Sequence, residues 1–418
     1  MVVLTEEHVG NCAYDFPVGF GSTRSNGWLF VAYYDAEHHL TVSARKPNDA
    51  TWHHQTLPSQ ANWDSHRAIE LAVDKTGCLH VSGNMHADPL VYFKTSEPLD
   101  IATFERLEPM VRAEDEERAT YRRILKGAKG DLYFMDRHGG SGNGITIVNR
   151  CDADTGAFER VSDKPLFDGL NEMSAYLSGP SLGPDGRYHL TWVWRNTPHC
   201  ETNHDLSYAV SDDLLRWSPR AGTSLGLPIT PQTDPFTVDP VPSEGDIING
   251  GHTMVFDTDN SPILIYHKYD EAGISQVHIA RHDGTDWTIH CVSDWNHRWA
   301  FTGPGSITNE IQLGRPRIER ATLAIPYWHI KRGNGLLNVD LKSNTRISDQ
   351  PIDGRSKPYP AELGEPRTDG LTVRWLPVDD SSDVRSAFRW ELGGKRRFYD
   401  PPDPAIPPGP LMFYQFSD

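Results

Sequence analysis

Short runs in which apolar and polar residues alternate recur along the chain, each separated from the next by a turn that contains glycine or aspartate. The segments VAYYD (31–35), LHVSG (79–83) and LTWVW (190–194) show the period of two that half-buried β-strands require. Stretches with a helical period are scarce. The pattern therefore predicts an all-β protein built from many short strands.

These strands belong to a larger repeating unit: a strand, a Gly/Asp turn, a second strand that ends in polar residues, a loop, and a strand that closes near an aromatic residue. Seven imperfect copies begin at Trp28, His66, Thr120, Ala175, His252, Gly314 and Leu371. Units of about 40–75 residues are typical of β-propellers, whose blades usually hold four strands. We therefore predict a seven-bladed β-propeller that forms a single domain over residues 1–418, with the terminal strands sharing one blade. A two-sheet sandwich and a right-handed β-helix are the competing all-β architectures. The β-helix is disfavoured because its coils are much shorter than these repeating units.

One turn between strands has a recognisable form. Ser211-Asp212-Asp213-Leu214-Leu215-Arg216-Trp217 resembles the Asp-box turn of sialidase-like propellers, although it is one residue shorter, and Arg281–Trp287 is a looser version. In such a turn the aspartate caps backbone amides and the tryptophan packs between blades. We expect this segment to be structural and not catalytic.

Composition supports a folded, acidic protein. Only 37% of the 418 residues are hydrophobic, but 10% are aromatic, which disfavours disorder. The net charge of −17 repels nucleic acid and anionic lipid, so we expect neither a nucleic-acid nor a membrane partner. The same charge disfavours a long, densely sulfated polymer as substrate.

The cysteines and the N-terminus bear on compartment. Five widely spaced cysteines form no CxxC pair, so we expect mostly free, partly buried thiols. The first residues have neither a basic nor an apolar signal region, so we expect no signal peptide here. A cytoplasmic protein and a secreted protein whose signal has been removed are both compatible with this observation.

Aligning the repeats places histidine, tyrosine and arginine at equivalent positions. The starts of the first strands carry His66, Tyr121, Tyr176, His252 and Arg315. The ends of the second strands carry Tyr34, His86, Arg137, Arg195, Lys268 and His329. Because corresponding strand ends meet at one face of a propeller, we expect these side chains to form a functional pocket. They are the residue types of acid–base catalysis and carboxylate recognition.

The composition of these two rings favours one kind of chemistry. The sequence shows no Ser/His/Asp arrangement, no GxSxG, no P-loop lysine and no evident pair of pocket carboxylates of the kind glycosidases use. A set of His, Tyr and Arg suits removal of a proton α to a carboxylate. The arginine pairs with the carboxylate, a neutral His or a Tyr takes the proton, and a second such group protonates the leaving oxygen. On a sugar this reaction is β-elimination from a uronic acid.

Two segments, Trp63–Thr95 and Thr120–Gly144, resemble the BNR-repeat polysaccharide lyases. This family of seven-bladed propellers includes ulvan lyases and the L-rhamnose-α-1,4-D-glucuronate lyases that act on gum arabic, and the similarity extends over most of the chain. Four positions match its motifs: His66 in D-x-H, His86 in N-M-H, Tyr121 in T-Y-R and Arg137 in D-R-H-G-G. The resemblance implies that Arg137 neutralises the uronate carboxylate while the other three share the base and acid roles.

The predicted function is therefore cleavage of a rhamnose-α-1,4-glucuronate linkage by β-elimination, most similar to the L-rhamnose-α-1,4-D-glucuronate lyases. The acidic charge favours a gum arabic or arabinogalactan-type substrate, with ulvan second. We expect the protein to be a monomer whose partner is a uronic-acid-containing oligo- or polysaccharide. We expect the sugar to be held by Tyr176, Arg195, His252, Lys268 and His329. The chemistry requires no cofactor; a structural metal ion is compatible with the sequence, with His199, Cys200 and His204 as candidate ligands.

Two other functions fit parts of the pattern. A sialidase-like hydrolase would share the propeller, the Asp-box turns, a tyrosine nucleophile and an arginine cluster (Arg137, Arg195 and Arg317), but its acid–base Asp and nearby Glu cannot be placed. A non-catalytic lectin would use the aromatic ring to stack sugars. Its sites should be nearly equivalent in each blade, whereas these repeats differ at the ring positions.

Overall fold

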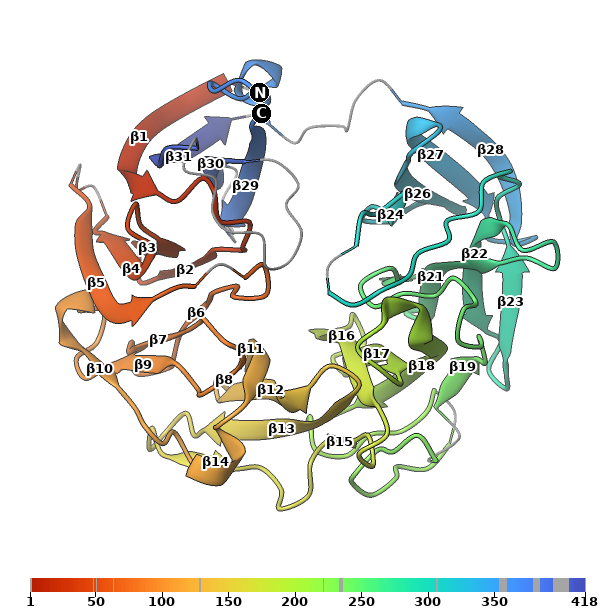
Figure 1. Cartoon of the computed structure of the whole chain (residues 1–418), viewed down its shortest axis with the longest axis horizontal. Helices are drawn as coiled ribbons and strands as arrows, with labels where there is room; N and C mark the ends of the chain where they lie inside the picture. The colour runs from red at the N-terminus through yellow and green to blue at the C-terminus, as the bar shows by residue number, and fades with distance from the viewer. Residues whose placement is uncertain are drawn as a thin grey trace. The chain divides into compact units, whose positions relative to one another are not determined.

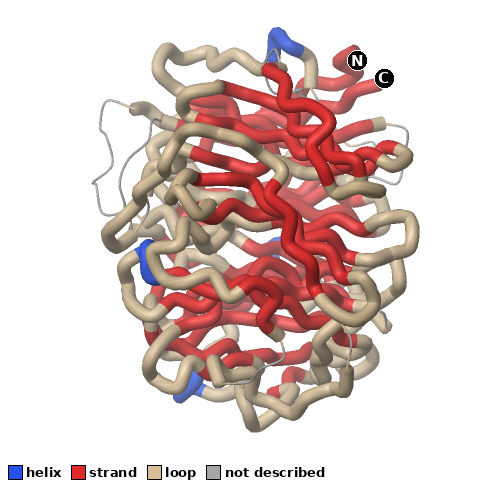
Figure 2. The backbone as a smooth tube through the Cα atoms, turned by 90° about the vertical axis from the view of Figure 1, so that its right-hand side faces the viewer, coloured by secondary structure: helices blue, strands red, loops and turns tan. Residues whose placement is uncertain are grey.

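The described part of the chain folds into β-strands joined by turns and loops. The computed structural model describes residues 2–417 except 48, 50, 63, 128, 221, 233–235, 306, 353–358, 379–383 and 394–405. In this part, helices are limited to short 3-10 turns (Figure 2). They are η1 (Ile101–Thr103), η2 (Ala113–Asp115), η3 (Cys200–Thr202) and η4 (Ala361–Leu363). None of the helices within the described ranges is long and apolar enough to cross a membrane. The all-β prediction is confirmed.

Two compact units divide the chain, and the first comprises Met1–Gly139, Ile147–Val161 and Lys357–Asp418. Its first sheet has the order β2 (Gly21–Ser25), β3 (Trp28–Tyr34), β4 (His39–Arg45), β5 (His53–Gln60). Its second sheet has the order β10 (Phe104–Arg106), β9 (Tyr92–Thr95), β7 (Leu79–Ser82), β6 (Glu70–Val73). Both are antiparallel throughout, as hairpin-connected strands must be.

The third sheet carries the residues of greatest interest. Its order is β14 (Phe158–Arg160), β13 (Asn143–Cys151), β12 (Leu132–Gly140), β11 (Ala119–Lys126), β8 (His86–Asp88), with β15 (Phe167–Asp168) also paired to β13. The hairpin tip Gly140–Thr146 and β15 belong to the second unit.

The two ends of the chain meet in the fourth sheet. Its order is β1 (Val2–Cys12), β31 (Gly409–Ser417), β30 (Arg385–Leu392), β29 (Thr372–Val378) (Figure 1). β1 and β31 are antiparallel and pair from Val2↔Ser417 to Cys12↔Gly409. The terminal strands thus share one sheet, whereas their sharing one propeller blade stays a prediction.

The second unit comprises Gly140–Thr146 and Ser162–Ser356 and contains three further sheets. The first has the order β16 (Ser174–Leu182), β17 (Tyr188–Arg195), β18 (Asn203–Ser211), β19 (Thr237–Asp239). The second has the order β20 (Thr253–Phe256), β21 (Pro262–Tyr269), β22 (Ser275–His282), β23 (Trp287–Cys291). The third has the order β24 (Ile311–Leu313), β26 (Thr322–His329), β27 (Gly333–Asp340), β28 (Thr345–Pro351), with β25 (Arg317–Glu319) also on β26. The described residues thus form seven sheets, whereas the number of blades and the single domain stay predictions.

The inner strands are buried on both faces. Every residue of β7 and β17 is buried, and in β3 only Trp28 is partly exposed. The prediction of half-buried strands is wrong for these segments, because the polar residues in the alternation are buried as well. The outer strand β5 keeps the alternation, with Leu57 and Ser59 inward and their neighbours exposed.

A repeated hydrogen-bond relay explains how polar residues are accommodated inside these sheets. The Tyr208 hydroxyl donates to Nδ1 of His189 at 2.6 Å, and Nε2 of His189 donates to Asp185 at 2.9 Å. In the sheet of β6–β10, Tyr92, His80 and Asp74 repeat this arrangement, with 3.0 Å between His80 Nε2 and the Asp74 carboxylate. Each relay joins the turn after a first strand to the second and third strands. A satisfied buried network of this kind fixes strand register.

The Asp-box-like turn has the structural role expected of it. The Asp213 carboxylate accepts backbone N–H groups of Leu215 at 3.0 Å and Arg216 at 2.9 Å. Trp217 is completely buried. The cysteines are also as predicted, since all five are free thiols and all except Cys291 are buried.

Candidate active site

A tight turn before β6 places the first histidine of the site. The Asp64 carbonyl accepts the Arg67 N–H at 3.3 Å, and Oδ1 of Asp64 accepts the His66 N–H at 2.9 Å. The same Oδ1 lies 2.8 Å from Nδ1 of the His66 ring. Asp64 therefore caps the turn and orients the imidazole of His66 at the same time.

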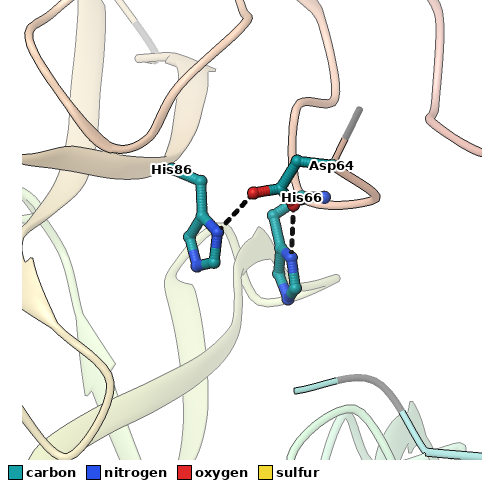
Figure 3. A group of neighbouring side chains, drawn as sticks. All are labelled: Asp64, His66 and His86. Atoms are coloured by element: carbon teal, nitrogen blue, oxygen red, sulfur yellow. Dashed lines mark hydrogen bonds and ion pairs between the residues drawn. The ribbon is translucent and has the colours of Figure 1, made fainter. Parts of the chain in front are cut away.

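The second histidine reaches the same carboxylate from another element. His86 opens β8, and its Nδ1 lies 2.6 Å from Oδ2 of Asp64 (Figure 3). The rings of His66 and His86 stack with 4.2 Å between centroids and 17° between planes. In Figure 3 both rings lie next to Asp64, and the Nδ1 atom of each ring faces one oxygen of the Asp64 carboxylate. Side chains separated by twenty positions thus stack on each other and share one carboxylate.

The pairing of β8, β11 and β12 places the remaining two predicted catalytic residues, Tyr121 and Arg137, next to the histidines. Thr120 on β11 pairs with His86 on one side and with Arg137 on β12 on the other. The register shifts between Thr120 and Arg123, and Tyr121 within this bulge has φ 58. That conformation is costly for an aromatic residue and is a common feature of functional sites.

The bulge directs the Tyr121 ring towards the histidines. The ring centroid of Tyr121 lies 5.8 Å from that of His66, and the Arg137 guanidinium carbon lies 4.9 Å from the Tyr121 ring. Tyr121 is 39% exposed, whereas Arg137 is buried. All four predicted catalytic residues are therefore neighbours within the first unit.

Arg67 holds the two histidine-bearing segments together. Its NH1 donates to the Asn84 carbonyl at 2.8 Å and to Asn84 Oδ1 at 3.0 Å, and its NH2 pairs with Asp88 at 3.0 Å. The Arg67 carbonyl accepts the hydroxyl of Tyr34 at 2.7 Å. Tyr34, which the repeat alignment placed in the ring, thus supports the turn instead of lining a pocket.

The protonation of the site follows from burial and from the shared carboxylate. Burial raises the pKa of the Asp64 carboxyl, but the hydrogen bonds from His66 and His86 outweigh it and hold that pKa well below its ordinary value. Burial lowers the pKa of His66, opposed by its bond to Asp64 and assisted by the nearby charges of His86 and Arg137. At neutral pH the site thus combines a carboxylate, a neutral His66 and an arginine.

Two groups among the described residues have donor atoms close enough to hold a metal ion. One is Asp64, His66 and His86, whose donor atoms lie within 4.8 Å of one another. The other is Asp74, His80 and Cys151, but its Asp and His belong to the relay that the second unit repeats without a cysteine. The relay therefore explains why Asp74 and His80 lie together, and no metal ion is needed to account for this group.

The predicted ligands His199, Cys200 and His204 are not one of the groups of described residues whose donor atoms lie within 4.8 Å of one another. His199 is 3.3 Å from Glu201, and His204 lies 2.8 Å from both Asp205 and Asn196. Cys200 is buried in an apolar cluster. These three residues do not fit a metal site.

The five predicted sugar-binding residues lie in the second unit. Arg195 is buried, and its guanidinium carbon lies 5.3 Å from the centroid of the Tyr176 ring. The guanidinium donates hydrogen bonds to the backbone carbonyls of Thr197 at 3.1 Å, of His199 at 3.2 Å, and of Pro198. Its guanidinium therefore shapes the loop 197–199. The Tyr176 hydroxyl is 2.5 Å from Ser141 Oγ.

The other three have equally defined surroundings. Lys268 forms an ion pair with Asp239 at 2.7 Å. His252 and His329 are buried, and burial lowers the pKa of each to about 4. The sugar-binding role of the five stays a prediction.

Sequence reasoning missed Asp64, two positions before His66, and Arg67, directly after it. The signal was present in D-S-H-R, because an aspartate two positions before a histidine caps a turn and reaches the ring. Trp63, which opens the lyase-like segment, lies outside the described residues.

Comparison with known proteins agrees with this fold. A model of a family described as BNR repeat-containing matches residues 28–295, whereas no curated protein matches the chain. The polysaccharide lyase Uly1 is similar with a TM-score of 0.64 and 14% identity, over 97% of this chain and 92% of that one. A PL25 ulvan lyase bound to -[GlcA(1-4)Rha3S]- is similar with a TM-score of 0.58 and 14% identity, over 94% and 92%.

At these identities the likeness shows the fold, and the predicted β-propeller class is confirmed. The family match covers well over half of the chain. The chain therefore belongs to the BNR repeat-containing family.

Proposed function

We propose that the chain is a polysaccharide lyase that cleaves a glucuronate-containing polysaccharide by β-elimination. The observation that carries the proposal is the cluster of His66, His86, Tyr121 and Arg137, four side chains of the required types from four segments of one unit. The solved structures with this fold support it, since they include polysaccharide lyases, one of them bound to a glucuronate–rhamnose oligosaccharide.

The reaction makes three demands on the residues. A base removes the proton at C5, the C–H electrons form the C4=C5 double bond, and the C4–O4 bond breaks as the leaving oxygen gains a proton. Removing the C5 proton builds negative charge beside the uronate carboxylate. Arg137, always protonated and planar, pairs with that carboxylate and offsets the charge.

The histidine pair takes the C5 proton and Tyr121 donates one to O4. His66 suits the first role because burial lowers its pKa and keeps it neutral at pH 7. Tyr121, the exposed member of the cluster, suits the second because it can reach a bound chain. In D-glucuronate the C5 hydrogen and O4 lie on the same side, so groups on one face can serve both.

The substrate is a rhamnose-α-1,4-glucuronate step. A gum arabic or arabinogalactan-type polymer is favoured because a chain of net charge −17 repels a densely sulfated one. Ulvan ranks second, on the strength of the oligosaccharide in the similar structure.

The cluster does not favour hydrolysis. Ordinary glycosidases use two carboxyl groups, one as acid and one as base or nucleophile. Of the two described carboxylates beside these four residues, Asp64 is buried and bonded to both histidines, and Asp88 is paired with Arg67.

The test is to incubate the protein with gum arabic and, separately, with ulvan while ultraviolet absorbance is recorded. We expect absorbance from the new conjugated double bond to grow with gum arabic. Reducing sugar released without absorbance would show a hydrolase, and binding with neither signal would show a lectin; either result refutes the proposal.

A further inference from the structure

We infer that Asp64 is a positioning residue that holds His66 and His86 in the same tautomer, so that the two rings act as one proton-accepting pair. The inference rests on the proposed function, because it specifies how the base of that site is prepared. It concerns a residue that touches neither the uronate carboxylate nor the reacting atoms.

The argument begins with hydrogen-bond polarity. An ionised carboxylate accepts hydrogen bonds and donates none. Asp64 stays ionised, because the two histidine bonds hold its pKa well below the ordinary value despite burial. Nδ1 of His66 at 2.8 Å and Nδ1 of His86 at 2.6 Å must therefore both carry a hydrogen. Each neutral ring then has its lone pair on Nε2, the atom directed away from Asp64 (Figure 3).

The stacking of the rings limits how many protons the pair can hold. Two imidazolium ions with centroids 4.2 Å apart would repel each other at a site with little solvent. Arg137, whose charge also lowers the pKa of His66, adds to that repulsion, and the Arg67–Asp88 ion pair is neutral overall. The single negative charge of Asp64 balances one added proton but not two. The pair therefore accommodates a single added proton.

A simpler role for Asp64 would be to cap the turn alone. Oδ1 accepts the backbone N–H of His66, which an asparagine oxygen would accept equally well. The two roles differ at Oδ2, which faces His86. In Asp64→Asn an NH₂ group replaces that oxygen, so Nδ1 of His86 must become an acceptor and its hydrogen must move to Nε2. The substitution keeps the cap and removes one lone pair from the reactive side.

The experiment uses full-length protein labelled with ¹⁵N in histidine. Long-range nitrogen–proton spectra identify which ring nitrogen carries the hydrogen, without any substrate. We expect His66 and His86 of the wild type to be Nδ1–H, and His86 of Asp64→Asn to change to Nε2–H while His66 does not. Single His66→Gln and His86→Gln variants assign the signals.

Kinetics on the substrate that the wild type eliminates provide the second readout. We expect Asp64→Asn to lower kcat ~10²-fold, the usual scale for a positioned base, with KM changed less than about threefold. The matched control is Asp154→Asn, a surface carboxylate bonded to Lys75, which should behave as wild type.

The outcomes separate the inference from the proposed function. A wild type that produces no unsaturated product refutes the lyase proposal, while the tautomers still test the role of Asp64. An Nε2–H tautomer for either wild-type histidine overturns the inference. So does an Asp64→Asn enzyme with wild-type kcat, or activity that a chelator abolishes and zinc restores, which would make the three residues metal ligands.

Discussion

His66 and His86 stack almost parallel, 17° apart, although one lies in a turn before β6 and the other opens β8 in a different sheet. Neither residue's local sequence requires the contact. It arises because Arg67 joins the turn to the segment before β8 and because one carboxylate lies between the two rings.

Arg137→Lys should lower kcat at least ~10²-fold with unchanged thermal stability. Lysine keeps the charge but loses the planar fork that can hold a carboxylate through two hydrogen bonds. Initial rates of ultraviolet-absorbing product provide the measurement. The control is Arg106→Lys, an exposed arginine paired with Glu108, which should have normal activity. A fully active Arg137→Lys enzyme would remove this residue from carboxylate recognition.

Activity should persist to lower pH than an ordinary histidine base allows. The base must be neutral, and burial lowers the pKa of His66 below its usual value of 6.5. The acid limb of kcat/KM against pH should therefore have its midpoint below 6.5. Circular dichroism over the same range controls for unfolding. A midpoint above 7 would contradict the assignment of His66 as base.

Arg195→Ala should destabilise the protein, because three backbone carbonyls of the loop 197–199 lose their donor. The residues of this loop are exposed, so water can replace the guanidinium, and a lost hydrogen bond then costs about 0.5–1.5 kcal/mol; we expect a loss of about 1–3 kcal/mol in urea unfolding. Arg216→Ala, at a highly exposed arginine, should change stability by less than about 1 kcal/mol. If Arg195→Ala instead kept full stability and only raised KM, the predicted sugar-binding role would be supported.

Acid should destabilise the second unit through three buried histidines. Burial lowers the pKa of His252, His278 and His329 to about 4, below the value of 6.5 that applies when unfolded. Their neutral forms therefore stabilise the fold fully above pH 6.5. That stability is lost as the pH falls towards 4, because the unfolded chain takes up protons that the folded chain does not.

A difference of about 2.5 pKa units corresponds to roughly 3 kcal/mol for a fully buried histidine such as His252. Urea unfolding at pH 7.5 and pH 4.5 measures the effect, and His252→Asn should flatten the dependence. Equal stability at both pH values would show that these rings are protonated in the folded protein.

The sequence determined the features that depend on local pattern. Repeated strand–turn–strand units predicted an all-β propeller, because turn residues and alternation act within a few positions of each other. His66 and Tyr121 could be selected because they open the first strands of their repeats, and His86 and Arg137 because they end the second strands; the resemblance to the lyases then singled out these four. The Asp-box turn was also predictable, since Asp213 caps amides only two and three residues away.

Tertiary structure decided which of those residues meet and what each one does. The alternation of apolar and polar residues in β17 does not reveal that both faces of the strand are buried, because the segments that bury them are distant in the sequence. Arg195 and Arg137 occupy equivalent repeat positions, yet a loop carbonyl cluster surrounds one and Tyr121 faces the other. Asp64 gained its place between two histidines from contacts across twenty-two positions, which no local pattern encodes. The sequence states which chemical group each side chain carries, but packing between distant segments determines which other groups it contacts.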